Sequence, residues 1–266
     1  MHVVITGSTR GIGLALARQF LAAGDNVLIS SRTQDRVDTI TQKLNEQFPD
    51  HVEGMVADVT RYEDLESLAE FAKTKWGNID VWVNNAGTKG GKGYLQDREP
   101  DKIAMVMETN ITGTMFGCRV AINAGVRHIF NMDGSGSNGR ILVGSIVYGT
   151  SKRPIPYISK AVAKEMEDQD LKIGVHTISP GMVLTDLLIS DATLRQKRAF
   201  NILAEQPSTA AAYLVPKMRS VAMTTKTGTY YKYLTNFKAT LRFMTAWRYK
   251  NRFFDRDGNL IVELED

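Results

Sequence analysis

The chain has 266 residues, of which 43% are hydrophobic and 23% are charged, a composition that excludes an intrinsically disordered chain and predicts one large apolar core. Its formal net charge of +4 is too small to indicate nucleic acid binding. The single cysteine, Cys118, excludes an internal disulfide, and without paired Cys or His ligands we expect no metal site.

Short apolar runs alternate with amphipathic segments from residue 2 to residue 181. This alternation predicts right-handed βαβ units, and so an α/β fold of the Rossmann type, with a doubly wound, mostly parallel sheet and helices on both faces. No apolar run reaches the roughly 18–20 residues that a membrane span requires. The expected strands are 2–6, 26–31, 52–59, 79–87, 127–134 and 173–181, and the expected helices are 13–24, 36–48, 64–77, 102–122 and 157–169.

The first strand runs into a glycine-rich turn, "ITGSTRGIG" at residues 5–13. Gly7 would permit the tight turn, Gly11 the approach of a pyrophosphate, and Gly13 the close packing of helix on strand. Because the turn follows a strand and opens a helix, it predicts a dinucleotide site rather than an ordinary turn. The residues expected to line it are Gly7, Ser8, Thr9, Arg10, Gly11, Ile12 and Gly13.

The end of the second expected strand indicates which dinucleotide is bound. An NAD site usually has Asp or Glu there, whereas this chain has Ser31 followed by Arg32. Arg32, together with Arg10, can offer guanidinium groups to a 2′-phosphate. We therefore expect NADPH as the cofactor.

A tyrosine and a lysine lie four residues apart in "YGTSK", which places Tyr148 and Lys152 on one face of a helix. An ammonium group and a nicotinamide close to the phenol would lower its pKa toward neutrality. A second Y-x-x-x-K, from Tyr213 to Lys217, contains Pro216, which disfavours a continuous helix. We expect Tyr148 and Lys152 to be the catalytic pair.

Together with "ITGSTRGIG" and "NNAG" (84–87), this pair makes the sequence resemble the short-chain dehydrogenase/reductase family over roughly residues 1–188. The resemblance implies that Tyr148 donates a proton to the substrate carbonyl and that Lys152 holds the nicotinamide ribose and tunes Tyr148. It implies that Asn110 supports a water relay to the lysine. The further cofactor contacts that it implies are Asp58, Val59, Asn85, Ala86, Gly87, Pro180, Gly181, Val183 and Thr185.

A serine completes the catalytic set in this family, and three positions compete for its place. Spacing from Tyr148 selects Ser135, which we take as the catalytic serine. Alignment on the strand "HIFN" instead puts Gly134 there, and Ser137 is a further candidate.

Four segments resemble one branch of the family, the chlorophyll b reductases: "HIFNMDGSGSNGR", "YGTSKR", "SPGMVLTDLL" and "AAAYLVPKMR". Asp133, in place of the usual serine beside the fourth catalytic position, is part of this similarity. The resemblance implies NADPH-dependent reduction of the C7 formyl group of chlorophyll b, in the chloroplast at the thylakoid membrane, where a light-harvesting complex could be a partner. A general carbonyl reductase for a ketone, quinone or acyl substrate is the alternative.

Two features depart from the family pattern. Pro154 and Pro156 follow Lys152 closely, so we expect a kinked or late-starting helix there. The connection 118–128 is also shorter than in the resembled enzymes. The helices concerned commonly form the family's dimer interface, which leaves both a homo-oligomer and a hetero-oligomer open.

The regular alternation stops near Thr185, and 186–208 is expected to be a loop with short helices. We expect a catalytic domain at 1–229 and a basic, aromatic extension at 230–266. In the extension, the three- and four-residue spacing of apolar side chains over 230–254 predicts an amphipathic helix, with Lys and Arg around its apolar stripe. This helix would either pack on the domain or lie on an anionic membrane surface. Its apolar stripe is Tyr230, Leu234, Phe237, Leu241, Met244 and Trp247.

Overall fold

Seven parallel strands form one sheet in the computed structural model, which describes residues 1–265. The strand order is β3-β2-β1-β4-β5-β6-β7, so successive strands are added on one side of β1 up to β3 and on its other side from β4 onward, as expected of a doubly wound sheet. The strands are β1 (His2–Ile5), β2 (Asn26–Ser31), β3 (Val52–Val56), β4 (Val81–Asn84), β5 (His128–Met132), β6 (Gly174–Ser179) and β7 (Tyr230–Lys232).

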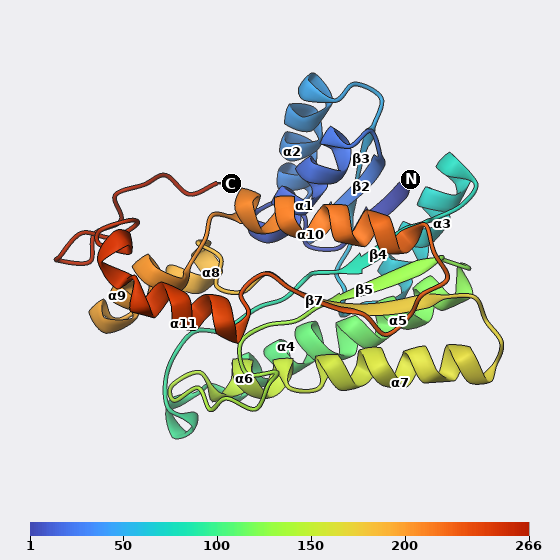
Figure 1. Cartoon of the computed structure of the whole chain (residues 1–266). Helices are drawn as coiled ribbons and strands as arrows, with labels where there is room; N and C mark the ends of the chain where they lie inside the picture. The colour runs from blue at the N-terminus through green and yellow to red at the C-terminus, as the bar shows by residue number, and fades with distance from the viewer. Residues whose placement is uncertain (266) are drawn as a thin grey trace.

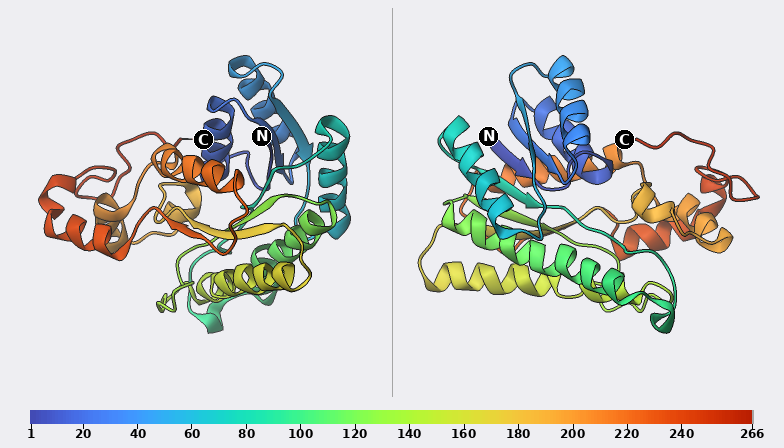
Figure 2. Two further views of the ribbon diagram at one scale, coloured as in Figure 1. Left: turned by 45° about the vertical axis from the view of Figure 1, so that its right-hand side comes forward. Right: turned by 180° about the vertical axis from the view of Figure 1, so that it is seen from behind.

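Helices cover both faces of the sheet (Figures 1 and 2). The α-helices are α1 (Gly11–Ala22), α2 (Gln34–Gln47), α3 (Tyr62–Trp76), α4 (Pro100–Met107), α5 (Gly113–Asn123), α6 (Ile146–Lys152), α7 (Ile155–Asp168), α8 (Asp186–Ile189), α9 (Leu194–Leu203), α10 (Pro207–Ala222) and α11 (Asn236–Met244). Shorter turns are the 3₁₀ segments η1 (Leu95–Asp97) and η3 (Ala246–Tyr249) and the π-helical η2 (Glu108–Thr112). No helix within residues 1–265 is long and apolar enough to cross a membrane.

Two apolar cores lie on opposite sides of the sheet because successive side chains of a strand alternate between its faces. Val3 and Ile5 of β1 pack with α1, α2 and α10, whereas Val4 between them packs with α3, α5 and α7. A smaller core joins α9 to the C-terminal segment through Phe200, Phe253 and Phe254.

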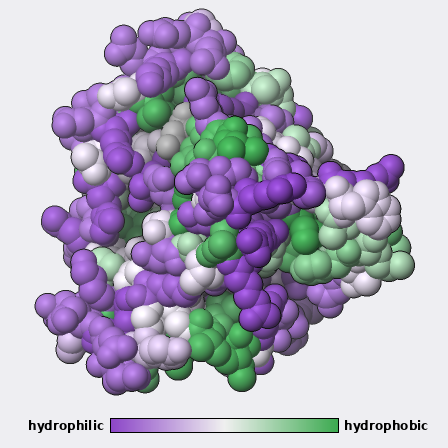
Figure 3. Space-filling model, turned by 90° about the vertical axis from the view of Figure 1, so that its left-hand side faces the viewer, coloured by the Kyte–Doolittle hydropathy of each residue, from purple (hydrophilic) through white to green (hydrophobic). Residues whose placement is uncertain are grey.

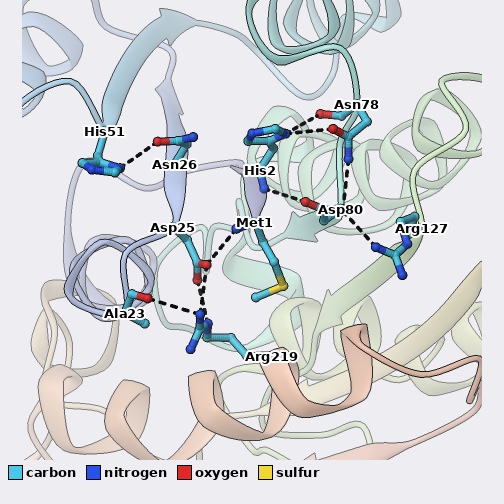
Figure 4. Close-up of polar contacts among 10 residues, drawn as sticks. All are labelled: Met1, His2, Ala23, Asp25, Asn26, His51, Asn78, Asp80, Arg127 and Arg219. Carbon is cyan, nitrogen blue, oxygen red and sulfur yellow. Dashed lines mark hydrogen bonds and ion pairs between the residues drawn. The ribbon is translucent and has the colours of Figure 1, made fainter.

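The amino-terminal edge of the sheet carries a network of ion pairs and hydrogen bonds (Figure 4). Asp25, which precedes β2, pairs with Arg219 of α10 at 2.8 Å, and Asp80, which precedes β4, pairs with Arg127 at 3.2 Å. Asp80 also accepts a bond from the backbone N–H of His2. These contacts stabilise the amino-terminal edge of the sheet, whereas parallel sheets bind ligands at the opposite, carboxyl-terminal edge.

The structure tests two expectations that prolines interrupt helices, and one of them is wrong. The expected interruption after Lys152 is confirmed, because α6 ends at Lys152 and α7 begins at Ile155. The expected break at Pro216 is wrong, because α10 runs through it. Leu214, Val215 and Met218 of α10 are buried in the core with α1, and this packing outweighs the lost backbone hydrogen bond.

The expectation of a single helix over 230–254 is wrong. Tyr230–Lys232 instead form β7, paired in parallel with β6, and the helix α11 covers only Asn236–Met244. Residues 186–208 contain two short helices, α8 and α9, as expected.

Candidate active site

The predicted site residues gather at the carboxyl edge of the sheet. The segments that follow β4, β5, β6 and β7 all lie on the left-hand side of Figure 1. Parallel strands present their ligand-binding loops at this edge, next to the position where the strand order reverses. Tertiary structure therefore brings together residues far apart in the sequence, such as Gly11 and Thr185, which are 174 positions apart.

The glycine-rich turn has the shape of a phosphate cradle. Gly7 and Gly11 have positive φ angles of 62° and 54°, which side chains rarely adopt. A Cβ on Gly13 would lie 2.4 Å from the carbonyl oxygen of Gly7 and from Nδ2 of Asn85. The side chain of Arg10, the N-cap residue of α1, makes no capping hydrogen bond, which leaves amides of the first turn for a pyrophosphate.

The glycine-rich turn is tied to the end of β2. The Ser8 N–H donates to the Ser30 carbonyl at 2.9 Å, and the Ser30 N–H donates back to Ser8 Oγ at 2.9 Å. Arg10 and Arg32 each follow one of these serines by two residues, so their backbones lie near one another at this corner of the sheet. Arg32 is exposed, and Arg10 forms a 3.7 Å ion pair with Asp186. Ser31, at the end of β2, is partly buried beside them.

The other predicted cofactor residues line the same edge. Asn85 Nδ2 donates to the carbonyls of Thr6 and Gly7 at 2.8 and 2.9 Å, joining β4 to the glycine-rich turn. Ala86 and Gly87 continue this wall, and a Cβ on Gly7 would lie 2.8 Å from Cα of Ala86. From the segment after β6, Thr185 lies against Gly11, whose added Cβ would meet its methyl group at 3.0 Å.

Five further predicted residues lie in loops that follow β3 and β6. Asp58 accepts bonds from the backbone and hydroxyl of Thr60, which orders the turn after β3. Val59 is buried against Gly113. Pro180 and Gly181 directly follow β6, and Val183 is buried and bridges to Glu205.

Tyr148 and Lys152 lie one turn apart on α6, as their spacing predicted. Lys152 is buried, and its Nζ donates to the carbonyl of Met132 at the end of β5, at 3.2 Å. Burial lowers the pKa of Lys152 to about 8, although the charge of Asp133 opposes this. Burial and then Asp133 raise the pKa of Tyr148, so the phenol keeps its proton at neutral pH. The expected lowering depends on a bound nicotinamide as well as on the ammonium group, and it stays a prediction.

Asn110 lies in the π-helical η2, which interrupts the single helix expected over 102–122. Its Oδ1 accepts from the backbone N–H of Thr88, and its Nδ2 donates to the Thr88 carbonyl and to Ser151 Oγ, each at 2.8 Å. A Cβ on Gly87 would lie 3.3 Å from Asn110 Oδ1 and 3.5 Å from Lys152 Nζ. The amide and the ammonium group therefore converge on the backbone at Gly87.

Gly134 occupies the position beside the phenol where a catalytic serine was expected. A Cβ on Gly134 would lie 2.4 Å from the Tyr148 hydroxyl, in agreement with the alignment on the strand. Ser135, the residue selected by spacing, is exposed, and no described contact joins it to Tyr148. Ser137 is buried, but it donates to Asp133 at 2.8 Å. Spacing failed because the chain turns directly after β5 and carries the Ser135 side chain outward.

Two residues at the site were not predicted to act there. Asp133 was noted only as a mark of resemblance, and Tyr230 was assigned to the tail helix. In the structure the Tyr230 hydroxyl donates a hydrogen bond to Asp133 Oδ2. A signal for this contact was present in the sequence. The segment "TYYKY" at 229–233 is rich in tyrosine and follows a glycine, a pattern that indicates a strand returning to the sheet.

A family model described as short chain dehydrogenase matches residues 1–195. The chain belongs to this family. Members with this fold bind a nicotinamide dinucleotide and catalyse oxidation or reduction, and the cradle around Gly7, Gly11 and Gly13 fits such a cofactor.

Relatives within the family carry more specific names. The chain is 43% identical over 247 residues to the chlorophyll(ide) b reductase NOL of Arabidopsis thaliana, covering 90% of this chain and 71% of that protein. It is 39% identical to the probable chlorophyll(ide) b reductase NYC1 of Oryza sativa subsp. japonica, covering 99% of this chain and 56% of that protein. The chain thus spans just over half the length of the rice protein.

Solved structures agree on the fold. A 3-ketoacyl-(acyl-carrier-protein) reductase from Brucella melitensis superposes with a TM-score of 0.74 at 22% identity, over 87% of this chain and 96% of that one. At this identity the likeness shows the fold of the short-chain dehydrogenase family alone.

Proposed function

We propose that this short-chain dehydrogenase uses NADPH to reduce the C7 formyl group of chlorophyll b to a hydroxymethyl group, in a chloroplast. The observation that carries the reaction class is the position of Tyr148. Its hydroxyl lies at the end of β5 beside Gly134, with Lys152 one turn away on the same helix. The substrate is supported by the 38–43% identity to four relatives named as chloroplastic chlorophyll(ide) b reductases.

In this mechanism the residues of the chain control a proton. Bound NADPH supplies the hydride that the formyl carbon accepts. Tyr148 gives its hydroxyl proton to the formyl oxygen, because burial and Asp133 keep the phenol protonated. Lys152, held by the Met132 carbonyl, places a positive charge close to the phenolate that remains.

The surroundings of the site suit a large apolar substrate. Five apolar side chains on the loops after β4 and β5 and at the start of α6 are exposed: Tyr94, Leu95, Ile141, Val143 and Ile146, with Ile141 85% and Val143 73% exposed. The Gly93 N–H donates to the Gly144 carbonyl at 3.0 Å and joins the two loops. Apolar patches interrupt a largely hydrophilic surface on this side of the molecule (Figure 3). Such a rim fits a pigment ring whose formyl group alone reaches Tyr148.

The preference for NADPH rests on the corner formed by Arg10 and Arg32. Arg32 directly follows β2, and Arg10 lies in the glycine-rich turn that is hydrogen-bonded to the end of β2. Within residues 1–265 neither guanidinium group forms an ion pair shorter than the 3.7 Å of Arg10 with Asp186. A 2′-phosphate would give each of them a charge-assisted hydrogen bond. NADH has no such group.

The outward face of α11 is proposed to dock on an anionic membrane surface. The helix buries Arg242, which binds Glu205, and therefore turns its apolar residues outward. Phe237 is 79% exposed and Trp247, just beyond the helix, is 72% exposed. Arg248 and Lys250 next to them are exposed and basic. Apolar side chains flanked by cations are typical of interfacial helices.

A direct assay tests the proposed reaction. The protein is incubated with chlorophyll b and NADPH, and the absorption change is followed as the formyl group leaves conjugation with the ring. Tyr148→Phe should abolish the reaction and leave NADPH binding nearly intact, because it removes the acid and little surface. The matched control is Tyr213→Phe, on α10, which should leave activity unchanged. Absence of pigment turnover by the wild-type protein would refute the proposal.

A further inference from the structure

Asp133 is a buried carboxylate with an unusual set of partners. It is 4% exposed and directly follows β5. Its Oδ1 accepts from the backbone N–H of Gly134 at 2.6 Å, and its Oδ2 accepts from Ser137 Oγ at 2.8 Å and from the Tyr230 hydroxyl. Within residues 1–265 no Lys, Arg or His nitrogen forms an ion pair with it. Three neutral donors thus hold the charge in place without cancelling it.

The residues on either side of Asp133 contact the catalytic pair. The Met132 carbonyl accepts a hydrogen bond from the Lys152 ammonium group, and Gly134 lies against the Tyr148 hydroxyl. The carboxylate therefore acts on both groups at short range in a poorly solvated environment, where charges interact strongly. Tyr230, on β7, is the further titratable group in contact with the carboxylate. Arg153 contacts the cluster only through the Ser137 carbonyl, at 2.7 Å.

We propose that Asp133 is a positioning residue that keeps the site in the protonation state that carbonyl reduction requires: its fixed negative charge holds the proton on Tyr148 and the positive charge on Lys152 as the pH rises. This inference rests on the proposed role of Tyr148 as proton donor. Reduction adds a hydride to the carbonyl carbon and the Tyr148 proton to its oxygen, and oxidises the cofactor. The phenolate must then recover a proton, which a nearby anion favours. Oxidation of an alcohol would need Tyr148 as a base, which the same anion disfavours.

The sign of the effect is the same for both catalytic groups. A negative charge raises the pKa of a nearby phenol and raises the pKa of a nearby ammonium group. The charge of Asp133 acts in this direction on Tyr148 and on Lys152. Replacing Asp133 by a neutral residue should therefore lower both pKa values, and both groups should lose their protons at lower pH.

The test titrates the phenol without any substrate. Phenolate absorbance is measured against pH for the wild-type protein and for Asp133→Asn, each corrected with the same protein carrying Tyr148→Phe. We expect the Tyr148 titration in Asp133→Asn to move to lower pH by about one unit or more. The wild-type protein could unfold at high pH before Tyr148 loses its proton. In that case, formation of the Tyr148 phenolate in folded Asp133→Asn shows by itself that the titration has moved to lower pH. Ser137→Ala is the matched control, since it removes a hydrogen bond to Asp133 but keeps the charge, and should leave the titration in place.

Several outcomes would overturn the inference. One is a folded Asp133→Asn, verified by circular dichroism, whose Tyr148 titration is unchanged or moves to higher pH. Asp133→Ser replaces it if the asparagine variant does not fold, and failure of both to fold would show that the carboxylate is structural. The alkaline limb of kcat/KM for chlorophyll b reduction should also move to lower pH. If the phenol titration shifts but chlorophyll b is not reduced by the wild type, the proposed substrate fails and the role of Asp133 stands.

Discussion

Placing a serine at residue 134, where alignment on β5 puts the catalytic serine of the family, should damage this enzyme. In Gly134→Ser the new Cβ would lie 2.4 Å from the Tyr148 hydroxyl, whereas ordinary contact begins at 3.4 Å. The phenol must therefore retreat by about 1 Å, because Cγ and Cδ of Lys152 close the other side at 3.0 and 3.2 Å. A misplacement of about 1 Å at a reacting group can cost about 100-fold in rate, or about 2.7 kcal/mol of transition-state stabilisation.

The fold should tolerate this change. The φ angle of Gly134 lies outside the left-handed region, so a serine can adopt the same backbone conformation. We expect kcat/KM for chlorophyll b to fall about 100-fold in Gly134→Ser and in Gly134→Ala, with the Kd for NADPH nearly unchanged. The two variants share the clash and differ only in the hydroxyl.

The control is Ser135→Ala, which removes the exposed hydroxyl selected by spacing and should leave kcat/KM close to the wild-type value. Steady-state rates from pigment absorption and NADPH titration by fluorescence together separate lost chemistry from lost binding. Wild-type or greater activity in Gly134→Ser would refute the reasoning, because the hydroxyl rather than the space would then be what the site lacks.

Three further predictions concern the cofactor, the C-terminal segment and the membrane. Arg32→Ala should weaken NADPH binding by about 1.5–3 kcal/mol and leave NADH binding unchanged, and equal titration curves for the two cofactors in the wild type would contradict the assignment. Glu205→Gln should lower the free energy of unfolding, measured in urea, by about 3–5 kcal/mol, because Arg242 and Arg252 lose a buried counter-charge. The control is Glu167→Gln, in an exposed pair with Lys164, which should leave the urea unfolding curve unchanged. Replacing Phe237 and Trp247 by serine should abolish co-sedimentation with anionic vesicles at low salt without loss of thermal stability, and wild-type protein that fails to sediment would remove the membrane proposal.

Acid should weaken the attachment of the C-terminal segment through the same glutamate. Burial opposes ionisation of Glu205, but hydrogen bonds from Arg252 and Arg242 lower its pKa below the ordinary value. A group whose pKa is lower in the folded state stabilises the protein above its unfolded pKa of about 4.3, and this contribution is lost as the pH falls through the folded value. The unfolding free energy of the wild type should therefore approach that of Glu205→Gln as the pH is lowered.

Local features of the sequence were enough to predict the framework of the fold and the cofactor cradle. The alternation of strands and helices, the glycines at 7, 11 and 13, and the four-residue spacing of Tyr148 and Lys152 each express a constraint within one turn or one βαβ unit. Pro154 likewise marked the end of α6, because the missing N–H acts on its own helix.

Only the tertiary structure decided which residues surround the phenol and which side of the last helix faces outward. Gly134 lies against Tyr148, and Asp133 contacts Tyr230, because β5, β7 and α6 end at one edge of the sheet. In a loop that turns, the number of residues between two positions does not give the distance between their side chains. Tyr230 joined the sheet instead of a helix because pairing with β6 satisfies its backbone. The α11 helix turned its apolar residues outward because Glu205, itself buried, required the Arg242 guanidinium, and an unpaired buried charge costs more than exposed apolar surface.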